Sequence, residues 1–457
     1  MKTINKLSTA LLLTIAGGSA LADQSSEIRD LRARLDALEQ QSAANKTAIA
    51  NTQSEIQAVY KASPLMVRRT INDAASAAAR IDNATYGDDL SGFFKLPNTQ
   101  SVMRIGGSVK LDGIYDLDPT GDPDQFLVSY LPATGPDNQF HLHAKQSRIS
   151  IEIRRPTTSD VGPLRILIEN DFFGPGGSSN FRMRHAFAQV NNVLVGYTYS
   201  TLMDADSIPN TLDFAGPGGS LYLFTPQLRF SKTLGEGTNI AFAIERPASE
   251  IDYDGAPATI ATGITAGDDY ESTPMPDFVV RGRWESTGGH VQLGAVVREV
   301  AYDNGTGLDD SVMGGGASIT GVVKTIGADS LQFGVTGGQG IGHYYSDFNG
   351  GSQDAGFNAS GELEALKSMG GFIAYQRFWS EKWNSALVYG NLQVDNSAGQ
   401  APSAIHKDQY SSVNLIWNPT GSLNLGMEVL HGTLGLKDGS DRDATRIQFS
   451  VQFDLIR

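Results

Sequence analysis

The residues of this sequence that most directly suggest a binding chemistry are two arginines spaced two positions apart, Arg182 and Arg184. In an extended strand this spacing places both side chains on one face. The alternation puts Ala186 and Ala188 on that face and Phe181, Met183 and Phe187 on the opposite one. A guanidinium presents paired N–H donors that match the two oxygens of a carboxylate. Arginines opposite apolar residues fit a wall with water on one side and lipid on the other.

An acidic segment at residues 203–219, the acidic loop, follows these arginines. It carries Asp204, Asp206 and Asp213 and closes on Pro-Gly-Gly, a composition that turns sharply and needs no core of its own. We predict that this loop folds inward and that its acids face the two arginines, forming a charged constriction. Replacing both arginines is then expected to lower anion selectivity and leave assembly intact.

Other basic residues lie on the same parity of strand-like segments, the parity predicted to face inward. They are Arg104, Lys110, Arg148, Arg165, Arg229, Arg281, Arg283 and Arg298. Any one of them can instead be neutralised by neighbouring acids such as Glu169, Asp171, Glu245 and Glu285. As a group they favour anions, because rings of charged side chains set which ions pass a pore.

Catalytic and metal-binding patterns are weak by comparison. No Ser, His and acid set stands in a recognisable nucleophile frame. His141 and His143 share a strand face without a third anchored ligand, so a surface pair near a loop is the better interpretation than zinc. We predict no catalytic residue, no metal and no cofactor.

The elements that must position these side chains are amphipathic strands. Apolar and polar residues alternate in sixteen segments. Their approximate edges are 102–117, 140–155, 163–173, 180–190, 193–202, 222–233, 238–247, 276–286, 289–302, 313–325, 329–343, 366–379, 382–396, 405–418, 422–437 and 443–456. Connections are short after every even segment and usually longer after odd ones, as in outer-membrane barrels. We predict an all-β transmembrane barrel of 16 antiparallel strands over residues 102–457.

The two faces of these segments differ in chemistry. Ile149, Ile151 and Ile153 alternate with Arg148, Ser150, Glu152 and Arg154, and Ile447, Phe449, Val451 and Phe453 alternate with Gln448, Ser450, Gln452 and Asp454. Aromatic residues such as Trp284, Trp379, Trp383 and Trp417 recur near segment ends, as in an interfacial girdle. The chain finishes on Leu-Ile-Arg, and Phe453 is the nearest aromatic residue on the outward parity.

The N-terminal sequence and the composition indicate a protein that is exported from the cytoplasm. Residues 1–22 have two lysines, an apolar run and an Ala-Leu-Ala site, which is the pattern of a signal peptide. No later stretch has the roughly 20 apolar residues of a transmembrane helix. The formal net charge is −15, which disfavours nucleic acid as a partner.

A heptad pattern occupies residues 23–60. Its seam starts at Ile28, Leu31, Leu35 and Leu38 and continues through polar residues to Val59. This predicts an α-helical coiled coil, with a lone amphipathic helix as the alternative. The heptad pattern does not by itself determine how many helices form the coiled coil. Residues 61–101 are predicted to be a linker. An even strand count places the coiled coil in the periplasm, where peptidoglycan is a candidate partner.

Several local sequences resemble the DcaP-like family of trimeric outer-membrane porins. They include Gly92–Pro97, Ile105–Asp112, Glu169–Phe173, Arg182–Ala186, Met203–Gly218 and Pro226–Arg229. The resemblance implies a sixteen-strand barrel, a homotrimer, an N-terminal periplasmic coiled coil, and uptake of small carboxylates, dicarboxylates in particular.

We therefore predict a channel for small anionic solutes in the outer-membrane lipid of a Gram-negative bacterium. Two alternatives are a trimeric autotransporter-type adhesin, in which each chain adds only a few barrel strands, and a lipase-like barrel enzyme.

Overall fold

The computed structural model describes residue 36 and residues 92–155, 162–175, 179–256, 270–305, 307 and 309–455. The chain divides into two compact units, Met1–Val67 and Arg68–Arg457, and the described residues belong almost entirely to the second. The predicted signal peptide (1–22), the predicted coiled coil (23–60, except residue 36) and most of the predicted linker (61–101) lie outside the described residues. Within the described part of the chain, no helix is long and apolar enough to cross a membrane.

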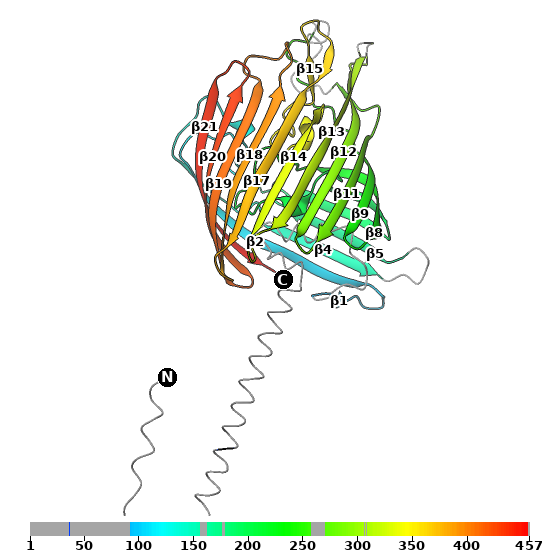
Figure 1. Ribbon diagram of the computed structural model, residues 1–457, viewed down its shortest axis with the longest axis vertical. Coiled ribbons are helices and arrows are strands. Elements are labelled where there is room, and N and C mark those ends of the chain that lie inside the picture. The colour runs from blue at the N-terminus through cyan, green and yellow to red at the C-terminus, as the bar shows by residue number, and fades with distance from the viewer. Residues whose placement is uncertain are drawn as a thin grey trace, which may run out of the picture. The chain divides into compact units, whose positions relative to one another are not determined.

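Sixteen antiparallel strands form one closed barrel (Figure 1). Strand β2 pairs with β4 on one side and with the last strand, β21, on the other, which closes the sheet. The barrel strands are β2 (Val102–Asp116), β4 (Arg148–Arg155), β5 (Leu164–Asp171), β6 (Arg182–Val190), β7 (Val193–Tyr199), β8 (Phe224–Gly235), β9 (Thr238–Glu245), β11 (Asp277–Ser286), β12 (Gly289–Asp303), β13 (Asp309–Lys324), β14 (Ser330–Gln339), β17 (Lys367–Phe378), β18 (Trp383–Asp395), β19 (Ile405–Thr420), β20 (Leu423–Leu436) and β21 (Asp441–Asp454). Each segment predicted from the alternation overlaps one of these strands, and some strands extend a few residues beyond the predicted edges. The predicted barrel is thus confirmed.

Shorter elements lie at the ends of these strands and in the connections. Strand β3 precedes β4 in the same segment and also pairs with β2, and β1 and β10 add short edges to β2 and β12. They are β1 (Phe94–Lys95), β3 (Gln139–His143), β10 (Glu271–Ser272), the paired strands β15 (Ala355–Phe357) and β16 (Leu363–Ala365), and the 3-10 helices η1 (Val128–Tyr130), η2 (Ala205–Ser207) and η3 (Gly342–Tyr344).

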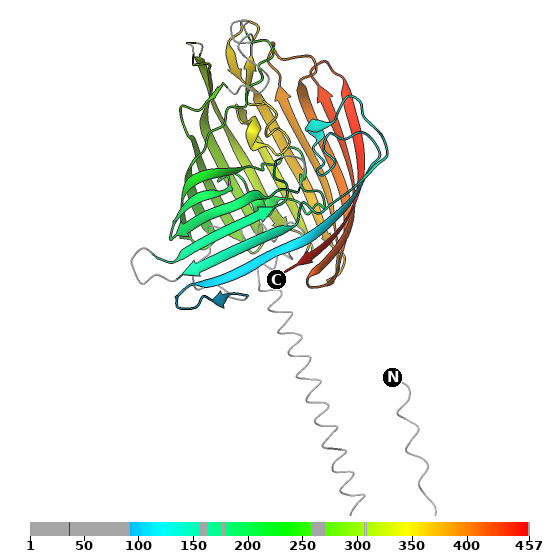
Figure 2. The same cartoon turned by 180° about the vertical axis from the view of Figure 1, so that it is seen from behind.

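The connections give the barrel two different ends. Connections at one end, the turn end, include residues 191–192 and 287–288, and those at the other, the loop end, include 117–138, 200–223 and 340–366. Viewed from behind, connections from the loop end enter the space between the strands (Figure 2). The predicted alternation of connection lengths is thus present.

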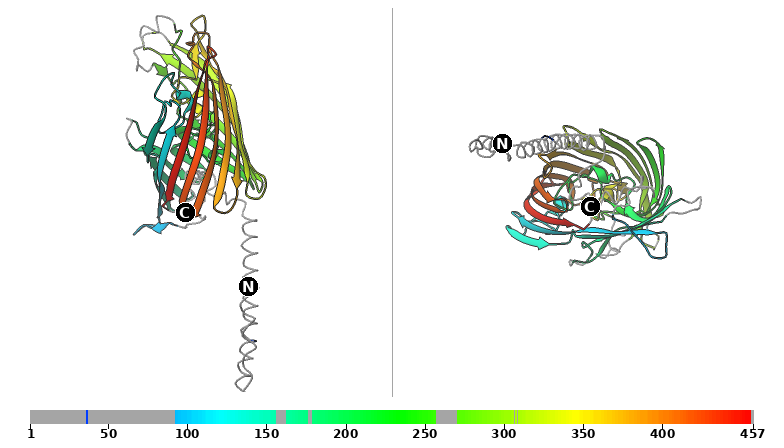
Figure 3. Two further views of the ribbon diagram at one scale, coloured as in Figure 1. Left: turned by 90° about the vertical axis from the view of Figure 1, so that its left-hand side faces the viewer. Right: turned by 90° about the horizontal axis from the view of Figure 1, so that it is seen from below.

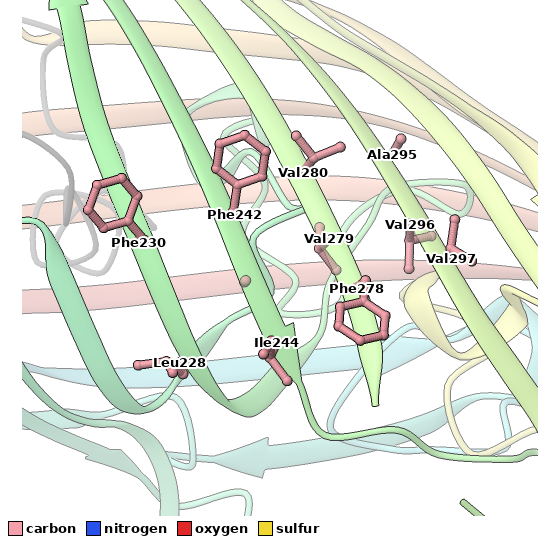
Figure 4. A pocket seen from close by; sticks show the side chains of 11 residues that line it. Leu228, Phe230, Phe242, Ile244, Phe278, Val279, Val280, Ala295, Val296 and Val297 are labelled. Atoms are coloured by element: carbon pink, nitrogen blue, oxygen red, sulfur yellow. The ribbon is translucent and has the colours of Figure 1, made fainter. Parts of the chain in front are cut away.

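The outward face of the barrel is apolar. Phe242, Phe449 and Phe453 are about half exposed, whereas Gln448 and Ser450 on the alternate positions are buried. Figure 4 shows this arrangement on β8, β9 and β11, where Leu228, Phe230, Phe242, Ile244, Phe278 and Val280 line a shallow apolar groove. A surface of this kind suits contact with lipid acyl chains.

A β-bulge in β6 corrects one part of the predicted faces. The register between β5 and β6 shifts between Glu169 and Asn170, so one extra residue of β6 is accommodated. Phe187 is therefore buried at 3% exposure against Leu167 and Leu194, although the strict alternation predicted it on the lipid side. Beyond Arg184 the predicted parity of this strand is wrong, because a bulge reverses the faces of every later residue.

Glycines on the inner face of the barrel make room for the connection 200–223. A Cβ atom at Gly294 would lie 2.7 Å from Leu202, and one at Gly426 would lie 2.7 Å from Leu212. A Cβ at Gly390 would lie 2.8 Å from Pro217. Seen from below, the strands surround an interior that contains loop segments (Figure 3).

The hydrophobic core lies inside the barrel, between these segments and the strands. Leu202 and Leu221 from the connection after β7 pack with Tyr345 and Phe348 from the connection after β14, and Leu392 of β18 completes the contact from the strand side. Burial of these side chains holds the acidic loop inside the barrel.

Candidate functional site

An excess of positive charge covers the inner faces of β2, β4, β5 and β6. We call this the basic surface, and its arginines are Arg104, Arg148, Arg154, Arg165, Arg182 and Arg184. The carboxylates interleaved with them are Glu152, Glu169 and Asp171. Six guanidinium groups against these three carboxylates give a surplus of three positive charges. The inner face of β2 also carries Lys110, Asp112 and Asp116, which brings the surplus over the four strands to two.

Three arginines meet one carboxylate near the turn end. Glu152 accepts hydrogen bonds from Arg104 Nη2 at 2.6 Å, Arg154 Nε at 2.9 Å and Arg165 Nε at 2.7 Å. The side chains of Arg104 and Arg154 keep 27% and 11% of their surface exposed, and both guanidinium groups lie over the Phe93 ring, at 4.9 and 4.8 Å from its centroid. This cluster carries a surplus of two positive charges, part of which remains accessible.

Arg182 and Arg184 both point into the barrel but differ in environment. Arg182 pairs with Asp171 at 2.6 Å and its side chain is 29% exposed. Arg184 is fully buried. It donates to Glu169 at 2.9 Å, to Asp171 at 3.1 Å, and to the hydroxyl groups of two tyrosines, Tyr199 and Tyr222. Arg184 is therefore a saturated structural residue, while Arg182 keeps access to the interior.

An aromatic residue of the acidic loop lies against these two arginines, where the sequence predicted loop acids. The Arg182 guanidinium lies 4.8 Å from the Phe214 ring centroid, and that of Arg184 lies 5.5 Å from it. Cation–π contacts of this kind are attractive when they are shielded from water. The predicted pairing between the loop acids and Arg182 and Arg184 is wrong in this respect.

The loop acids Asp204 and Asp206 pair instead with the opposite side of the barrel. Arg283 of β11 donates to Asp204 at 2.8 Å and to Asp206 at 2.7 Å. Asp204 also contacts His290 Nε2 at 2.8 Å and Thr320 Oγ1 at 2.9 Å. Burial acts to raise the pKa of Asp204, but His290 and Arg283 hold that pKa below its usual value. These acids anchor the loop, so they do not present a free negative surface.

Asp213 has a third environment, inside the loop itself. It accepts the backbone N–H groups of Phe126 at 2.9 Å and Ala215 at 2.8 Å. Burial raises the pKa of Asp213 to about 6, although Arg446 partly opposes this effect. Asp213 therefore ties the acidic loop to the connection after β2.

The remaining predicted basic residues are dispersed, and each contacts polar groups of the protein. Lys110 is buried beside Asp112 at 3.0 Å and donates to the carbonyl of Leu212 at 2.6 Å. Arg298 pairs with Asp354 at 2.9 Å. Arg229 donates to the Tyr199 carbonyl at 2.6 Å and Arg281 donates to Asn239 at 3.0 Å. Of the acids suggested as neutralising partners, Glu245 instead accepts from Ser200 and Thr201.

The candidate residues chosen from sequence omit two members of the site. Arg154 was not selected, although it continues the spacing of Arg148, Ser150 and Glu152 on the inner face of β4. The alternation alone was a sufficient signal for it. Phe214 had no such signal, because only the folded loop brings its ring to the arginines of β6.

A partly buried carboxylate at the loop end gives a pH-dependent contact. The Gly350 amide donates to both oxygens of Glu250, at 2.8 and 2.9 Å, which joins the connections after β9 and β14. Burial and the neighbouring Asp354 raise the pKa of Glu250 to about 7. The folded protein therefore binds a proton more tightly than the unfolded chain does, and this contribution to stability falls as pH rises from about 5 to about 8.

We expect faster hydrogen exchange of the backbone amides in the connection after β14 at pH 8 than at pH 5, after correction for the intrinsic pH dependence of exchange, because a charged Glu250 beside Asp354 destabilises this connection. Mass spectrometry of exchanged peptides measures this difference. The Glu250→Gln variant should remove it, because the side chain keeps an acceptor and loses its titration. An equal pH response in that variant would contradict the assignment to Glu250.

Comparisons with known proteins give one family. A family model described as DcaP outer membrane protein matches residues 37–449. The crystal structure of the outer membrane channel DcaP of Acinetobacter baumannii aligns with a TM-score of 0.68 at 20% identity, covering 79% of this chain and 99% of that chain. Comparison with curated proteins gives no match.

Two further solved structures share the fold. An anion-selective porin from Comamonas acidovorans aligns with a TM-score of 0.52 at 11% identity, covering 78% of this chain and 100% of that one. Salmonella typhi OmpF in complex with daunomycin aligns with a TM-score of 0.51 at 11% identity, covering 79% and 100%. At these identities the likeness concerns the fold alone.

Proposed function

The chain belongs to the DcaP outer membrane protein family, which is a family of outer-membrane channels, and we propose that the solutes of this channel are small anions, dicarboxylates and related carboxylates in particular. The observation that carries the proposal is the charge imbalance of the basic surface. Glu152 balances only one of the three arginines that contact it. A passing carboxylate can complete this neutralisation, because guanidinium groups bind carboxylates with well-matched geometry.

The positions of the acidic-loop residues Asp204 and Asp206 also support selectivity for anions. Asp204 and Asp206 are paired with Arg283 on the far side of the barrel, so their charges are compensated before a solute arrives. Charges on one side of a water-filled path raise the local concentration of ions of the opposite sign. The partial exposure of Arg104, Arg154 and Arg182 keeps the interaction weak enough for release, which conduction requires.

The proposal extends to assembly and orientation. The protein forms a homotrimer in the outer-membrane lipid, and its loop end faces the cell exterior. The heptads at residues 23–60 then hold the subunits together in the periplasm, within reach of peptidoglycan. This part rests on the sequence pattern and on the resemblance to trimeric porins.

The two alternative functions have less support. Sixteen strands from a single chain close the barrel, whereas an adhesin of the autotransporter type builds one barrel from three chains. The lipase-like alternative has less support, because the family model describes an outer membrane protein and the solved structure that carries the family's name is a channel. Transport is therefore the function that the fold and the basic surface favour together.

The test removes the exposed charges of the Glu152 cluster. We expect the Arg104→Gln/Arg154→Gln variant to lower the anion-to-cation permeability ratio by about fivefold, since a charge 4 Å from a path in water contributes about 1 kcal/mol. Reversal potentials in a salt gradient across a planar bilayer measure the ratio, and raised salt should reduce the wild-type value by screening.

A matched control comes from the same strand. Arg155 follows Arg154, falls on the outward parity and is exposed, so Arg155→Gln should leave the ratio unchanged. A wild-type channel without anion preference, or a double variant with the wild-type ratio, would refute the proposed selectivity.

A further inference from the structure

Among the buried arginines that the structure describes, Arg148 stands out because two of its guanidinium nitrogens lack a hydrogen-bond partner. It lies on the inner face of β4 with 5% of its surface exposed. Neither its Nε nor its Nη1 has a hydrogen-bond partner. A buried guanidinium with unpartnered N–H groups is costly, because these groups have lost their water and gain no acceptor in exchange.

The acids near Arg148 are already engaged. Glu169 accepts from Arg184 at 2.9 Å, and Asp171 accepts from Arg182 at 2.6 Å and from Arg184 at 3.1 Å. These contacts direct both carboxylates toward β6 and leave Arg148 without an acceptor from the neighbouring strand. Glu169 attracts Arg148 but makes no hydrogen bond to it, so a carboxylate from outside the protein can complete the neutralisation.

We propose that Arg148 is a discrete binding station for a small carboxylate in the middle of the channel. The inference rests on the proposed anion function and names one residue of that pathway as the site of binding. The side of the guanidinium presents Nε and Nη2, and its end presents Nη1 and Nη2. A carboxylate that reaches Nη2 can therefore place its second oxygen on either of the two unpartnered nitrogens.

Arg148 and the Glu152 cluster form two successive positions along the channel. Residue 152 follows residue 148 by four positions on the same face of β4, which is about 13 Å at ~3.3 Å per residue. Arg104, Arg154 and Arg165 act on the mean charge of the path near the turn end. Arg148 supplies unsatisfied donors in a site with little water, and it is there that a solute is held.

The experiment separates binding from charge selectivity. Single-channel currents are recorded in potassium chloride while succinate is added, and the succinate concentration that halves the chloride current is measured. We expect Arg148→Gln to raise this concentration tenfold or more, because a hydrogen bond to a charged group is lost. Arg148→Lys should give an intermediate value, since an ammonium keeps the charge without the planar pair of donors.

The control variants keep the inference distinct from the proposed function. Arg104→Gln/Arg154→Gln should lower the permeability ratio but change the half-blocking concentration less than Arg148→Gln does, and Arg155→Gln should change neither. Recording from single channels restricts the measurement to folded, inserted protein. The station at Arg148 would be overturned, with anion selectivity left in place, by either of two results in an anion-selective channel. One is that succinate does not block the wild type, and the other is that the half-blocking concentration is the same in the wild type and in Arg148→Gln.

Discussion

The Asp204→Ala variant is expected to release the first half of the acidic loop from the barrel and to raise the single-channel conductance. Arg283, His290 and Thr320 all converge on this carboxylate, whose side chain is fully buried. Removing one partner of a buried ion pair costs about 3–5 kcal/mol, because the remaining charge loses its compensation. The freed segment then moves within the lumen, and the current should become noisier as well as larger.

Conductance and open-channel noise in planar bilayers measure this effect. Asp206→Ala is the matched control, since Asp206 also contacts Arg283 but is 16% exposed, and Arg283 keeps Asp204 and Glu285 in that variant. The second half of the loop stays attached in both variants, because Glu428 accepts the amides of Leu212 and Asp213. Equal conductance in the two variants would show that Asp204 does not hold the loop.

Replacing Arg184 by alanine is expected to destabilise the folded barrel strongly. The change removes the cation that neutralises the buried Glu169 and breaks four hydrogen bonds. It also removes the group lying between Phe214 and Phe224, at 5.5 and 5.0 Å from their centroids. An uncompensated buried carboxylate costs about 3–5 kcal/mol, which is a large part of the stability of a typical domain.

The urea midpoint of unfolding, read from the mobility shift of the folded barrel on gels, measures this loss. Arg182→Ala is the control, and it should cost about 1 kcal/mol or less, because Arg182 is partly exposed and Asp171 keeps Arg184. Arg184→Lys should not restore stability, since a lysine cannot reach the same set of acceptors in a fork geometry. A lower midpoint for Arg184→Ala than for Arg182→Ala would show that the two arginines cannot both be replaced without loss of assembly. Equal midpoints for Arg182→Ala and Arg184→Ala would contradict the structural role of Arg184.

The barrel itself was predictable from sequence because its signals are local. Alternation with a period of two identifies a strand and its two faces without reference to any other part of the chain. Ile149 and Ile151 are exposed outward while Arg148 and Glu152 are buried inward, as the pattern predicted. Connection lengths are equally local, so the count of sixteen strands and the two different ends followed from them.

The pairing of the charged residues was not predictable in this way. Arg283 and Asp204 are 79 positions apart in the chain, and Arg184 and Phe214 meet only when the loop folds into the barrel. The bulge in β6 is a further case, since a single extra residue reversed the face of Phe187 without any change in composition.

Sequence alone determined that arginines line the inside of a barrel, because side-chain direction in a strand depends on position within that strand. Only the tertiary structure decided which arginines keep a free charge. Neutralisation depends on acids from adjacent strands and from an inserted loop, and their placement depends on register and packing. Arg184 and Arg148 face the same interior from neighbouring parts of the wall. Arg184 donates to four acceptors, whereas Nε and Nη1 of Arg148 have no hydrogen-bond partner.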